Sequence, residues 1–184
     1  IIYLIGPTMG DVFQFMLGGQ KKWTDGLNGS GLLDAMPPHL KYEVKKVEEV
    51  VHFKNGATIW LQSAESPQFR GPEPDTIWGD EVLKWRYGET LISNLRLAAR
   101  AVGKVKSQCL FTASPKRVKL LRDIVMDPDT LTIRSVTDEN RGNVDPDWVD
   151  RERRRLDGTR QGLEELDGEL GLDEETDMFK LGLI

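Results

Sequence analysis

The sequence predicts an α/β fold with a mainly parallel sheet flanked by helices, an antiparallel hairpin at one edge and a helical C-terminal extension. Three observations lead to this prediction. Short apolar runs typical of buried strands alternate with amphipathic segments from Asp75 onwards. An Asn55-Gly56 pair separates two strand-like runs, and residues 145–170 are highly charged with helical character. Alternating strands and helices indicate a parallel sheet, because parallel neighbours need a crossover connection.

The length and composition are those of a soluble globular domain. The 184 residues can bury one substantial core but leave little room for a second. Hydrophobic residues make up 39% of the chain and charged residues 30%. No apolar run approaches the roughly 18 residues that a membrane-spanning helix needs. The apolar start at residues 1–5 is too short for a signal peptide and lacks a basic lead-in. We therefore expect no membrane contact.

The net charge of −5 and the pI of about 5.2 limit how the chain can contact nucleic acid. A protein that grips DNA strongly by itself is usually basic on at least one face, because phosphate contacts dominate the affinity. The acidic balance argues against tight DNA binding by a single copy. It leaves open weak, cyclic contacts made by many subunits around a ring.

The first part of the chain predicts a strand, a helix and an irregular loop. Residues 1–5 form an apolar run typical of a buried strand. Thr8 is a suitable helix N-cap, and Asp11 would lie in the first turn, near the positive end of the helix dipole. Apolar residues from 12 to 17 give the helix a buried face, and Gly18-Gly19 ends it. A glycine-rich loop follows.

An antiparallel hairpin is predicted next. Residues 42–53 form one strand-like run and residues 57–61 another, with Asn55-Gly56 between them. Asn-Gly between two such runs is the strongest short hairpin signal, because both residues tolerate the positive φ of a type I′ turn. We expect this part of the chain to lie at the edge of the sheet.

Strands and helices alternate in the second half. The predicted strands are residues 76–78, 107–112 and 130–136, and the predicted helices are residues 90–102 and 118–125. The apolar spacing within residues 90–102 is that of an amphipathic helix. Cys109 is the single cysteine and lies in an apolar run, so we expect it to be buried in a strand. A lone, buried cysteine favours a reducing compartment.

Residues 145–184 are predicted to be a helical extension, separate from a core at residues 1–144. Asp145 is a suitable N-cap, and Pro146 suits the first turn of the helix that follows. Four arginines at positions 151 and 153–155 form a basic cluster. On a helix they spread around much of the circumference. We therefore interpret them as a solvated face rather than as a contact with DNA or a partner.

Two adjacent carboxylates follow the predicted strand at residues 76–78. Asp80 and Glu81 would lie at the carboxyl edge of a parallel sheet, where ligands bind in open α/β sheets. Phosphoryl transfer needs an Asp to hold the Mg²⁺ shell and a second group to orient or deprotonate the attacking water. Asp80 fits the first role and Glu81 the second. Carboxylates also cap helices, so the pair alone leaves a structural role open.

A hydroxyl-rich loop, Thr112-Ala113-Ser114-Pro115, follows the next buried strand. In a parallel sheet this loop emerges beside Asp80 and Glu81. Its hydroxyls could hydrogen-bond the hydrolytic water or the γ-phosphate and relay the nucleotide state to a moving part. The alternative is a helix cap made by Ser114, with Pro115 in the first turn. Together the two loops favour a nucleotide-driven motor, which could equally be a helicase.

Arg70 is a third candidate. It is followed by Gly71 and Pro72, so we expect its loop to have a defined shape and to be exposed. A ring ATPase can place such an arginine at the γ-phosphate of the neighbouring subunit, where it is worth roughly 10³–10⁵ in rate. The alternative is a structural arginine paired with Glu65 or Glu73.

Taken in order, these segments resemble the large terminase subunit of tailed bacteriophages over roughly residues 2–170. Many ordered matches are far more specific than any one of them. The matching motifs are Pro7-Thr8-Met9-Gly10-Asp11, Ser30-Gly31-Leu32-Leu33, Gly56-Ala57, Ser63-Ala64-Glu65-Ser66-Pro67, Phe69-Arg70-Gly71-Pro72, Trp78-Gly79-Asp80-Glu81 with Trp85, Thr112-Ala113-Ser114-Pro115, Thr137 with Asn140, Gly158-Thr159-Arg160-Gln161, Glu165-Leu166 and Gly168-Glu169-Leu170.

The resemblance implies a P-loop-NTPase-like motor that uses ATP and Mg²⁺ to thread double-stranded viral DNA into a procapsid. Asp80 would be the Walker B aspartate that holds Mg²⁺ through water, and Glu81 the catalytic glutamate. Thr112 and Ser114 would belong to the coupling motif at the nucleotide, and Arg70 would act in trans. The implied partners are the portal protein, the small terminase subunit and further copies in a ring. The implied location is the host cytoplasm, at the portal.

Two departures from the family pattern qualify this expectation. A Walker A loop ending in Gly-Lys-Ser or Gly-Lys-Thr should precede Ile1, and Gly6-Pro7-Thr8 cannot replace it. The family's nuclease domain should follow, and the acidic run at residues 173–177 is too compact to supply its separated metal ligands. We expect an incomplete chain that is inactive alone. A helicase or translocase fragment, or a degenerate remnant that only binds partners, remains an alternative.

Overall fold

The computed structural model describes residues 1–18, 31–66, 68–69, 71–100 and 106–170. The chain divides into two compact units, Ile1–Ala113 and Ser114–Ile184. The functional division predicted between residues 144 and 145 stays a prediction.

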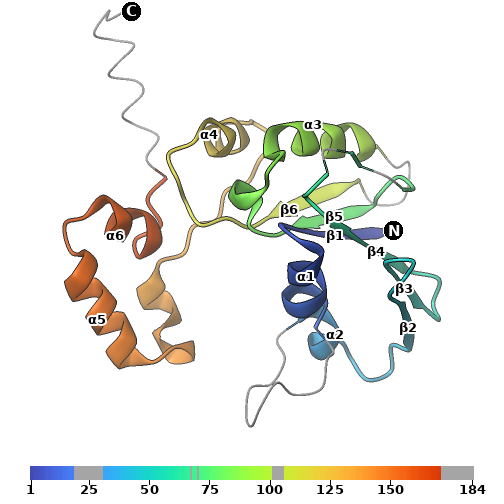
Figure 1. Ribbon diagram of the computed structural model, residues 1–184, viewed down its shortest axis with the longest axis horizontal. Helices are drawn as coiled ribbons and strands as arrows, with labels where there is room; N and C mark the ends of the chain where they lie inside the picture. The colour runs from blue at the N-terminus through green and yellow to red at the C-terminus, as the bar shows by residue number, and fades with distance from the viewer. Residues whose placement is uncertain (19–30, 67, 70, 101–105, 171–184) are drawn as a thin grey trace, which may run out of the picture. The chain divides into compact units, whose positions relative to one another are not determined.

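The described part of the first unit is built on a six-stranded sheet in the order β2-β3-β4-β1-β5-β6 (Figure 1). The strands are β1 (Ile2–Gly6), β2 (Tyr42–Lys45), β3 (Val50–Phe53), β4 (Thr58–Ser63), β5 (Thr76–Gly79) and β6 (Gln108–Phe111). β1 is parallel to β4 and β5, and β5 is parallel to β6. β2, β3 and β4 pair antiparallel at the other side. The predicted mainly parallel sheet with an antiparallel edge is confirmed.

The antiparallel edge differs from the prediction in one respect. The single strand expected over residues 42–53 is wrong, because a turn separates β2 from β3 and Glu49 in that turn has a φ of 57°. The Asn55-Gly56 hairpin between β3 and β4 is confirmed. Asn55 Oδ1 accepts from the Ala57 amide at 3.0 Å, and Gly56 has a φ of 90° that suits glycine.

The first helical segment combines α1 (Met9–Asp11) with a π-helical turn, η1 (Val12–Leu17). Thr8 caps it as predicted: its Oγ1 accepts from the Asp11 amide at 3.2 Å, and Asp11 Oδ2 accepts from the Thr8 amide at 3.0 Å. The segment ends at Gly18, which has a φ of 67°. The other helices in the described part of this unit are α2 (Leu32–Ala35), the short 3₁₀ turn η2 (Val82–Lys84) and α3 (Gly88–Ala98). Most of the glycine-rich loop lies outside the described residues.

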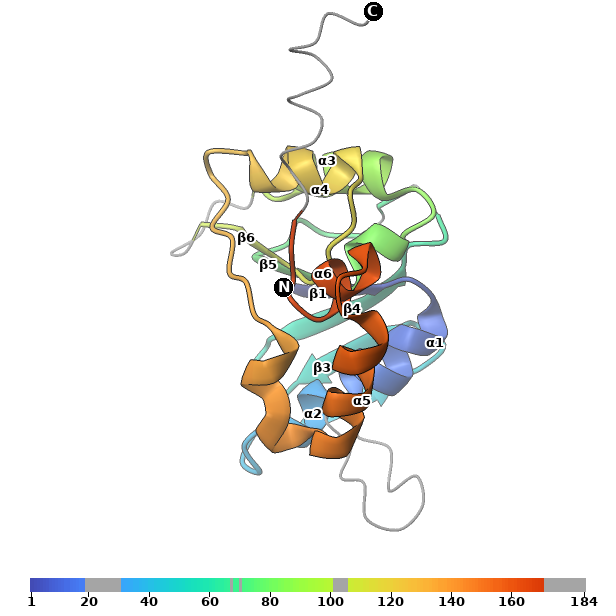
Figure 2. The same cartoon turned by 90° about the vertical axis from the view of Figure 1, so that its left-hand side faces the viewer.

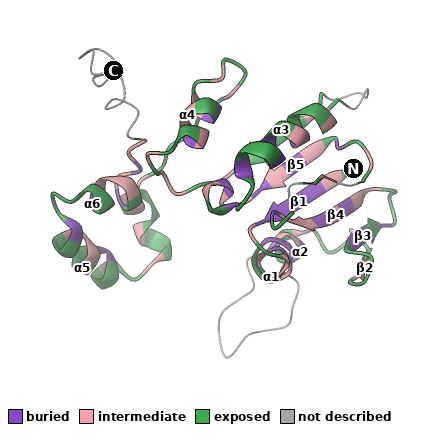
Figure 3. Ribbon diagram, turned by 45° about the horizontal axis from the view of Figure 1, so that its top comes forward, coloured by how far each residue is buried: buried purple, intermediate pink, exposed green. Residues whose placement is uncertain are grey.

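Helices cover both faces of the sheet. α1 and α2 lie on one face and α3 lies on the other, as the two views agree (Figures 1 and 2). Side chains alternate along a strand, so Leu4 of β1 points to the α1 face, while Tyr3 and Ile5 point to the α3 face. Burial is greatest in β1, where four of five residues are buried, and in β3, where three of four are buried (Figure 3). The α1-side core consists of Leu4, Val12, Met16, Leu17, Leu33, Val51, Phe53, Ile59 and Leu61.

Two predictions about the strands of the second half are wrong. Residues 130–136 form no strand, and Leu131 and Ile133 are both 85% exposed. Their apolar alternation is typical of a strand, but a strand needs a neighbour to pair with, and the described residues supply none here. Cys109 is exposed rather than buried, because β6 is the last strand of the described sheet.

The second unit is helical in its described part. It contains α4 (Lys119–Val125), the 3₁₀ segment η3 (Thr137–Asn143), α5 (Pro146–Leu156) and α6 (Arg160–Glu165). The predicted helix at residues 118–125 and the Asp145 cap are confirmed, since Asp145 Oδ1 accepts from the Asp147 amide at 3.0 Å. Thr159 caps α6, so the predicted helical extension contains two helices in its described part.

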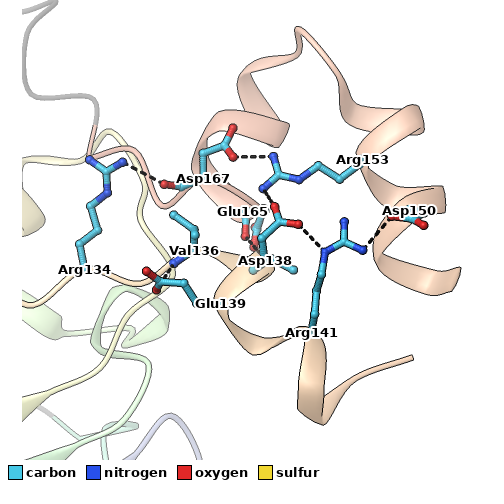
Figure 4. Close-up of polar contacts among 10 residues, drawn as sticks. Arg134, Val136, Asp138, Glu139, Arg141, Asp150, Arg153, Glu165 and Asp167 are labelled. Atoms are coloured by element: carbon cyan, nitrogen blue, oxygen red, sulfur yellow. Dashed lines mark hydrogen bonds and ion pairs between the residues drawn. The ribbon is translucent and has the colours of Figure 1, made fainter. Parts of the chain in front are cut away.

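Arg153 joins three parts of the second unit (Figure 4). It forms ion pairs with Asp138 of η3 and with Asp167 beyond α6, the latter at 2.5 Å. Arg141 of η3 also binds Asp138 at 2.6 Å and reaches Asp150 of α5 at 2.9 Å. Arg153 therefore departs from the predicted solvated face, because it holds η3, α5 and the end of α6 together.

This ionic network predicts a specific acid sensitivity. Hydrogen bonds from Arg141 and then Arg153 lower the pKa of Asp138. A lowered pKa means that the charged form stabilises the fold above the ordinary Asp value of about 4, and that this contribution is lost as the pH falls through the lower folded value. The Asp138→Asn variant should therefore show a smaller drop in its urea midpoint between neutral pH and about pH 3 than the unmodified chain.

The matched control for this measurement is Asp129→Asn, which changes an exposed aspartate of the same unit. It should keep the full drop of the unmodified chain. Equal drops in all three proteins would contradict a stabilising role for the Asp138 carboxylate.

Candidate active site

The carboxyl ends of the parallel strands meet at one edge of the sheet. In the sheet register, Gly6 lies opposite Ser63, Ile5 opposite Gly79, and Gly79 opposite Phe111. The residues that follow β5 and β6 therefore emerge side by side. As predicted, Asp80 and Thr112 occupy these neighbouring positions.

Asp80 is held through both its side chain and its main chain. Its Oδ1 accepts a hydrogen bond from the Thr112 hydroxyl at 2.6 Å. Its amide donates to the Ile5 carbonyl at 2.9 Å, which extends the β1–β5 pairing by one residue. Its carbonyl oxygen accepts from the indole Nε1 of Trp85, also at 2.9 Å. Both the carboxylate and the backbone of Asp80 thus have fixed partners.

Glu81 has a left-handed backbone conformation, with φ 51° and ψ 47°. Residues other than glycine seldom adopt this region, and such a conformation persists only when the surroundings impose it. The Glu81 amide donates to Thr112 Oγ1 at 3.1 Å. Its carboxylate forms an ion pair with Lys84 at 3.4 Å, at the start of the segment that leads into α3.

Thr112 connects the two acidic residues. Its hydroxyl donates to Asp80 and accepts from the Glu81 amide. Its own amide donates to the Gly79 carbonyl at 3.0 Å, and its carbonyl accepts from the Val82 amide at 3.0 Å. The Thr112 side chain therefore links the Asp80 carboxylate to the Glu81 backbone.

The other two predicted site residues, Ser114 and Arg70, have no described contact with Asp80 or Glu81. Ser114 belongs to the second unit. The alternative role as a helix cap is wrong for Ser114, because α4 begins at Lys119 with Val118 in the N-cap position. Arg70 lies outside the described residues. Glu73, one of its two suggested structural partners, forms an ion pair with Arg100 at 2.7 Å.

The loop on either side of position 70 is anchored to β1. The Tyr3 hydroxyl donates to the Pro72 carbonyl at 3.1 Å, and the Tyr3 ring packs against Phe69 with 4.6 Å between ring centroids. Tyr3 is fully buried, and this burial raises its pKa to about 12. Gly71 has a φ of 133°, which favours glycine.

Sequence reasoning missed two contacts of the site. Trp85 belongs to the pattern only as part of the family motif, and that pattern does not predict its hydrogen bond to Asp80. Lys84 belongs to none of the matching motifs. An acidic residue followed three positions later by a lysine is a weak signal, because exposed ion pairs of this kind are common and contribute little.

The donor set of this site suits a hydrated Mg²⁺ rather than a metal bound by protein groups alone. Among the described residues, no three His, Cys, Asp or Glu side chains are grouped to form a metal site. Mg²⁺ usually keeps several waters and takes one or two carboxylates together with substrate phosphates. Because Thr112 binds one oxygen of the Asp80 carboxylate, the other oxygen can accept from a metal-bound water.

None of the helices in the described residues has the length and apolar character required to cross a membrane.

Comparison with known proteins gives a family and a fold. Residues 2–182 match the family described as the terminase large subunit, T4-like-virus type, N-terminal. The chain is similar to the large terminase ATPase domain of Thermus phage P74-26, with 12% identity, a TM-score of 0.51, and 92% of this chain and 76% of that chain covered. No curated protein sequence matches.

A second similar structure is a large terminase from a thermophilic bacteriophage, solved in complex with ATP-γ-S. It has 14% identity and a TM-score of 0.57, and the match covers 92% of this chain but only 39% of that one. At these identities the two structures support the fold, whereas the match over residues 2–182 identifies the family. This chain belongs to the terminase large subunit family, in its N-terminal part.

Proposed function

We propose that this chain is part of the ATP-hydrolysing motor that packages double-stranded viral DNA into procapsids. The observation that supports it best is the Thr112 hydroxyl bridging Asp80 and the Glu81 amide at the carboxyl edge of the sheet. That edge is where nucleotides bind in open α/β folds. Membership of the large terminase family supplies the biological context.

Each site residue has a defined task in this proposal. Bound Mg²⁺ would neutralise the charge that develops on the phosphates. Asp80 would hold a water of the Mg²⁺ shell, with its carboxylate oriented by Thr112. Glu81 would orient or deprotonate the attacking water. Because Thr112 contacts both acidic residues, it would pass the nucleotide state from β5 to β6, and Ser114 would continue this coupling in the loop.

Arg70 is proposed to act in trans on the nucleotide of a neighbouring subunit. The loop residues around it support this proposal, since Phe69 and Pro72 are fixed to the buried Tyr3. A finger that works between subunits needs a loop of constant shape, because charge stabilisation depends on placement.

The proposed partners are double-stranded DNA, the portal protein, the small terminase subunit and further copies of the large subunit in a ring. The proposed location is the host cytoplasm, at the procapsid portal. The net charge of −5 fits this assembly better than a stand-alone DNA-binding protein. In a ring, weak contacts from several subunits add up through effective concentration.

The Asp80→Asn variant of the full-length large terminase tests this function. The amide keeps the shape of the side chain but weakens its hold on a hydrated cation. We expect ATP hydrolysis at saturating Mg²⁺ to fall about 10²-fold, together with a higher Mg²⁺ requirement, in a steady-state phosphate-release assay. The control is Asp129→Asn, which changes an exposed aspartate of the second unit. Unchanged hydrolysis and Mg²⁺ dependence in Asp80→Asn would contradict the assignment of the site.

A further inference from the structure

The peptide group between Asp80 and Glu81 is held at both of its polar ends. Its carbonyl, that of Asp80, accepts from the indole N–H of Trp85 at 2.9 Å. Its N–H, that of Glu81, donates to the Thr112 hydroxyl at 3.1 Å. The two partners lie on different elements, one at the end of η2 and one after β6. The orientation of this peptide plane is therefore fixed from two sides.

This peptide sets the conformation of Glu81. The plane before a residue is one of the two planes that its φ angle relates, and the φ of Glu81 is 51°. Glutamate has no intrinsic preference for a positive φ angle. The two hydrogen bonds supply the surroundings that impose it. Release of either bond would let Glu81 relax toward ordinary φ values, which would move its carboxylate.

Trp85 is itself rigidly placed. It is only 6% exposed, and its ring meets the edge of the Phe111 ring with 6.4 Å between centroids. Gly79 makes this approach possible: a Cβ at that position would lie 2.8 Å from atoms of both rings. Packing against β5 and β6 therefore fixes the direction of the indole N–H, and this direction does not depend on contacts with solvent.

We propose that Trp85 is a positioning residue for Glu81, acting through the Asp80–Glu81 peptide. This inference rests on the proposed ATPase function of the site. The indole N–H holds the shared peptide plane, the plane holds Glu81 in its left-handed conformation, and that conformation places the carboxylate for the attacking water. Thr112 holds the same plane from the other side, so the coupling loop and Trp85 share control of Glu81.

The structural half of the proposal can be tested on the 184-residue chain. Its five tryptophans give five indole signals in a ¹H–¹⁵N NMR spectrum, and Trp85→Phe assigns one of them. The Trp85 indole proton should exchange slowly with solvent, and Thr112→Val should shift its resonance through the shared peptide. If the Trp85 indole proton exchanged rapidly and its resonance did not shift in Thr112→Val, the proposed restraint of the Asp80–Glu81 peptide would be wrong.

The functional half is tested by Trp85→Phe in the full-length large terminase. Phenylalanine keeps an aromatic ring in the pocket and removes the N–H donor. We expect kcat for ATP hydrolysis to fall about 10- to 100-fold, with KM for ATP and the thermal midpoint nearly unchanged. A merely structural role would lower the thermal midpoint and leave kcat of the folded enzyme intact. The control is Trp148→Phe, which changes a tryptophan of α5 that is 41% exposed and has no role in the proposed site.

The outcomes separate this inference from the proposed function. If Glu81→Gln abolishes hydrolysis while Trp85→Phe keeps the unmodified kcat, the positioning role is wrong and the ATPase site stands. If Glu81→Gln also leaves hydrolysis unchanged, the proposed function itself fails. Loss of kcat in Trp85→Phe with an unchanged KM, absent from Trp148→Phe, supports the proposal.

Discussion

Replacing Glu81 by Gln in the full-length large terminase should lower ATP hydrolysis about 10²- to 10⁴-fold while ATP still binds. The loss follows from the chemistry of the attacking water. A glutamate carboxylate can accept a proton from that water, whereas an amide of the same shape cannot. The measurement pairs steady-state phosphate release with equilibrium binding of a fluorescent ATP analogue.

The fold around position 81 should survive this change. The left-handed backbone is held by Trp85 and Thr112 through the main chain, and neither bond involves the Glu81 side chain. The substitution removes one ion pair, with Lys84, whose side chain is 55% exposed. Pairs this exposed contribute little to stability. A fall in hydrolysis would thus report chemistry and not unfolding.

Two further variants separate the carboxylate from its surroundings. Glu89→Gln changes an exposed glutamate in the first turn of α3 and should leave hydrolysis unaltered. Lys84→Met removes the ion-pair partner and leaves the Glu81 carboxylate in place. If Lys84→Met reduced hydrolysis as much as Glu81→Gln, the carboxylate would act as an ion-pair partner rather than on water, and its assigned role would be wrong.

The site could be predicted from the sequence where topology alone decides position. Asp80 and Thr112 are 32 residues apart, yet each follows a short apolar strand in a parallel sheet. Carboxyl ends of neighbouring parallel strands share one edge, so their meeting needs no knowledge of side-chain packing. The Thr8 cap and the Asn55-Gly56 hairpin were likewise decided by local chemistry, and both predictions are confirmed.

What could not be predicted depends on which neighbours a segment finds. Residues 130–136 carry the alternation of a strand, but pairing is a property of two strands, and the sequence of one does not reveal the other. The exposure of Cys109 has a similar cause. Its apolar neighbours in sequence predict burial, but it lies in β6, the last strand of the described sheet, and is exposed. The hydrogen bond from Trp85 to Asp80 needs the turn of η2, which no residue pattern specifies.

Gly71→Ala should lower the free energy of unfolding by about 2–6 kcal/mol, the combined range of a strained backbone and an overpacked core. Two causes act at this position. The φ of 133° is one that residues with a Cβ rarely adopt, and an added Cβ would lie 1.9 Å from the Tyr3 hydroxyl oxygen. Tyr3 cannot move away cheaply, because it is fully buried between Trp60 and Phe69. Urea unfolding of the 184-residue chain measures the change.

Two other glycines separate the causes of this loss. Gly56 has a φ of 90° with nothing within 4 Å of an added Cβ, so Gly56→Ala isolates the backbone cost, about 1–2 kcal/mol. Gly142 lies in open space without a positive φ, so Gly142→Ala should change stability by less than about 0.5 kcal/mol. If Gly71→Ala cost no more than Gly56→Ala, the close contact with Tyr3 would not exist in solution.

A double-mutant cycle with Tyr3→Phe then tests the contact itself. Tyr3→Phe alone removes the bond to the Pro72 carbonyl, which costs about 1–3 kcal/mol if that carbonyl is left unpaired. It also removes the atom that the new Cβ would meet, since the next nearest atom, Cζ, lies at 3.1 Å. In the Tyr3→Phe background, Gly71→Ala should therefore cost little more than Gly56→Ala. Additive losses would mean that Tyr3 and Gly71 are independent. Coupled losses would show that the Tyr3 hydroxyl on β1 fixes the shape of the loop on either side of position 70. An arginine that acts between subunits needs a loop of fixed shape, because charge stabilisation depends on placement.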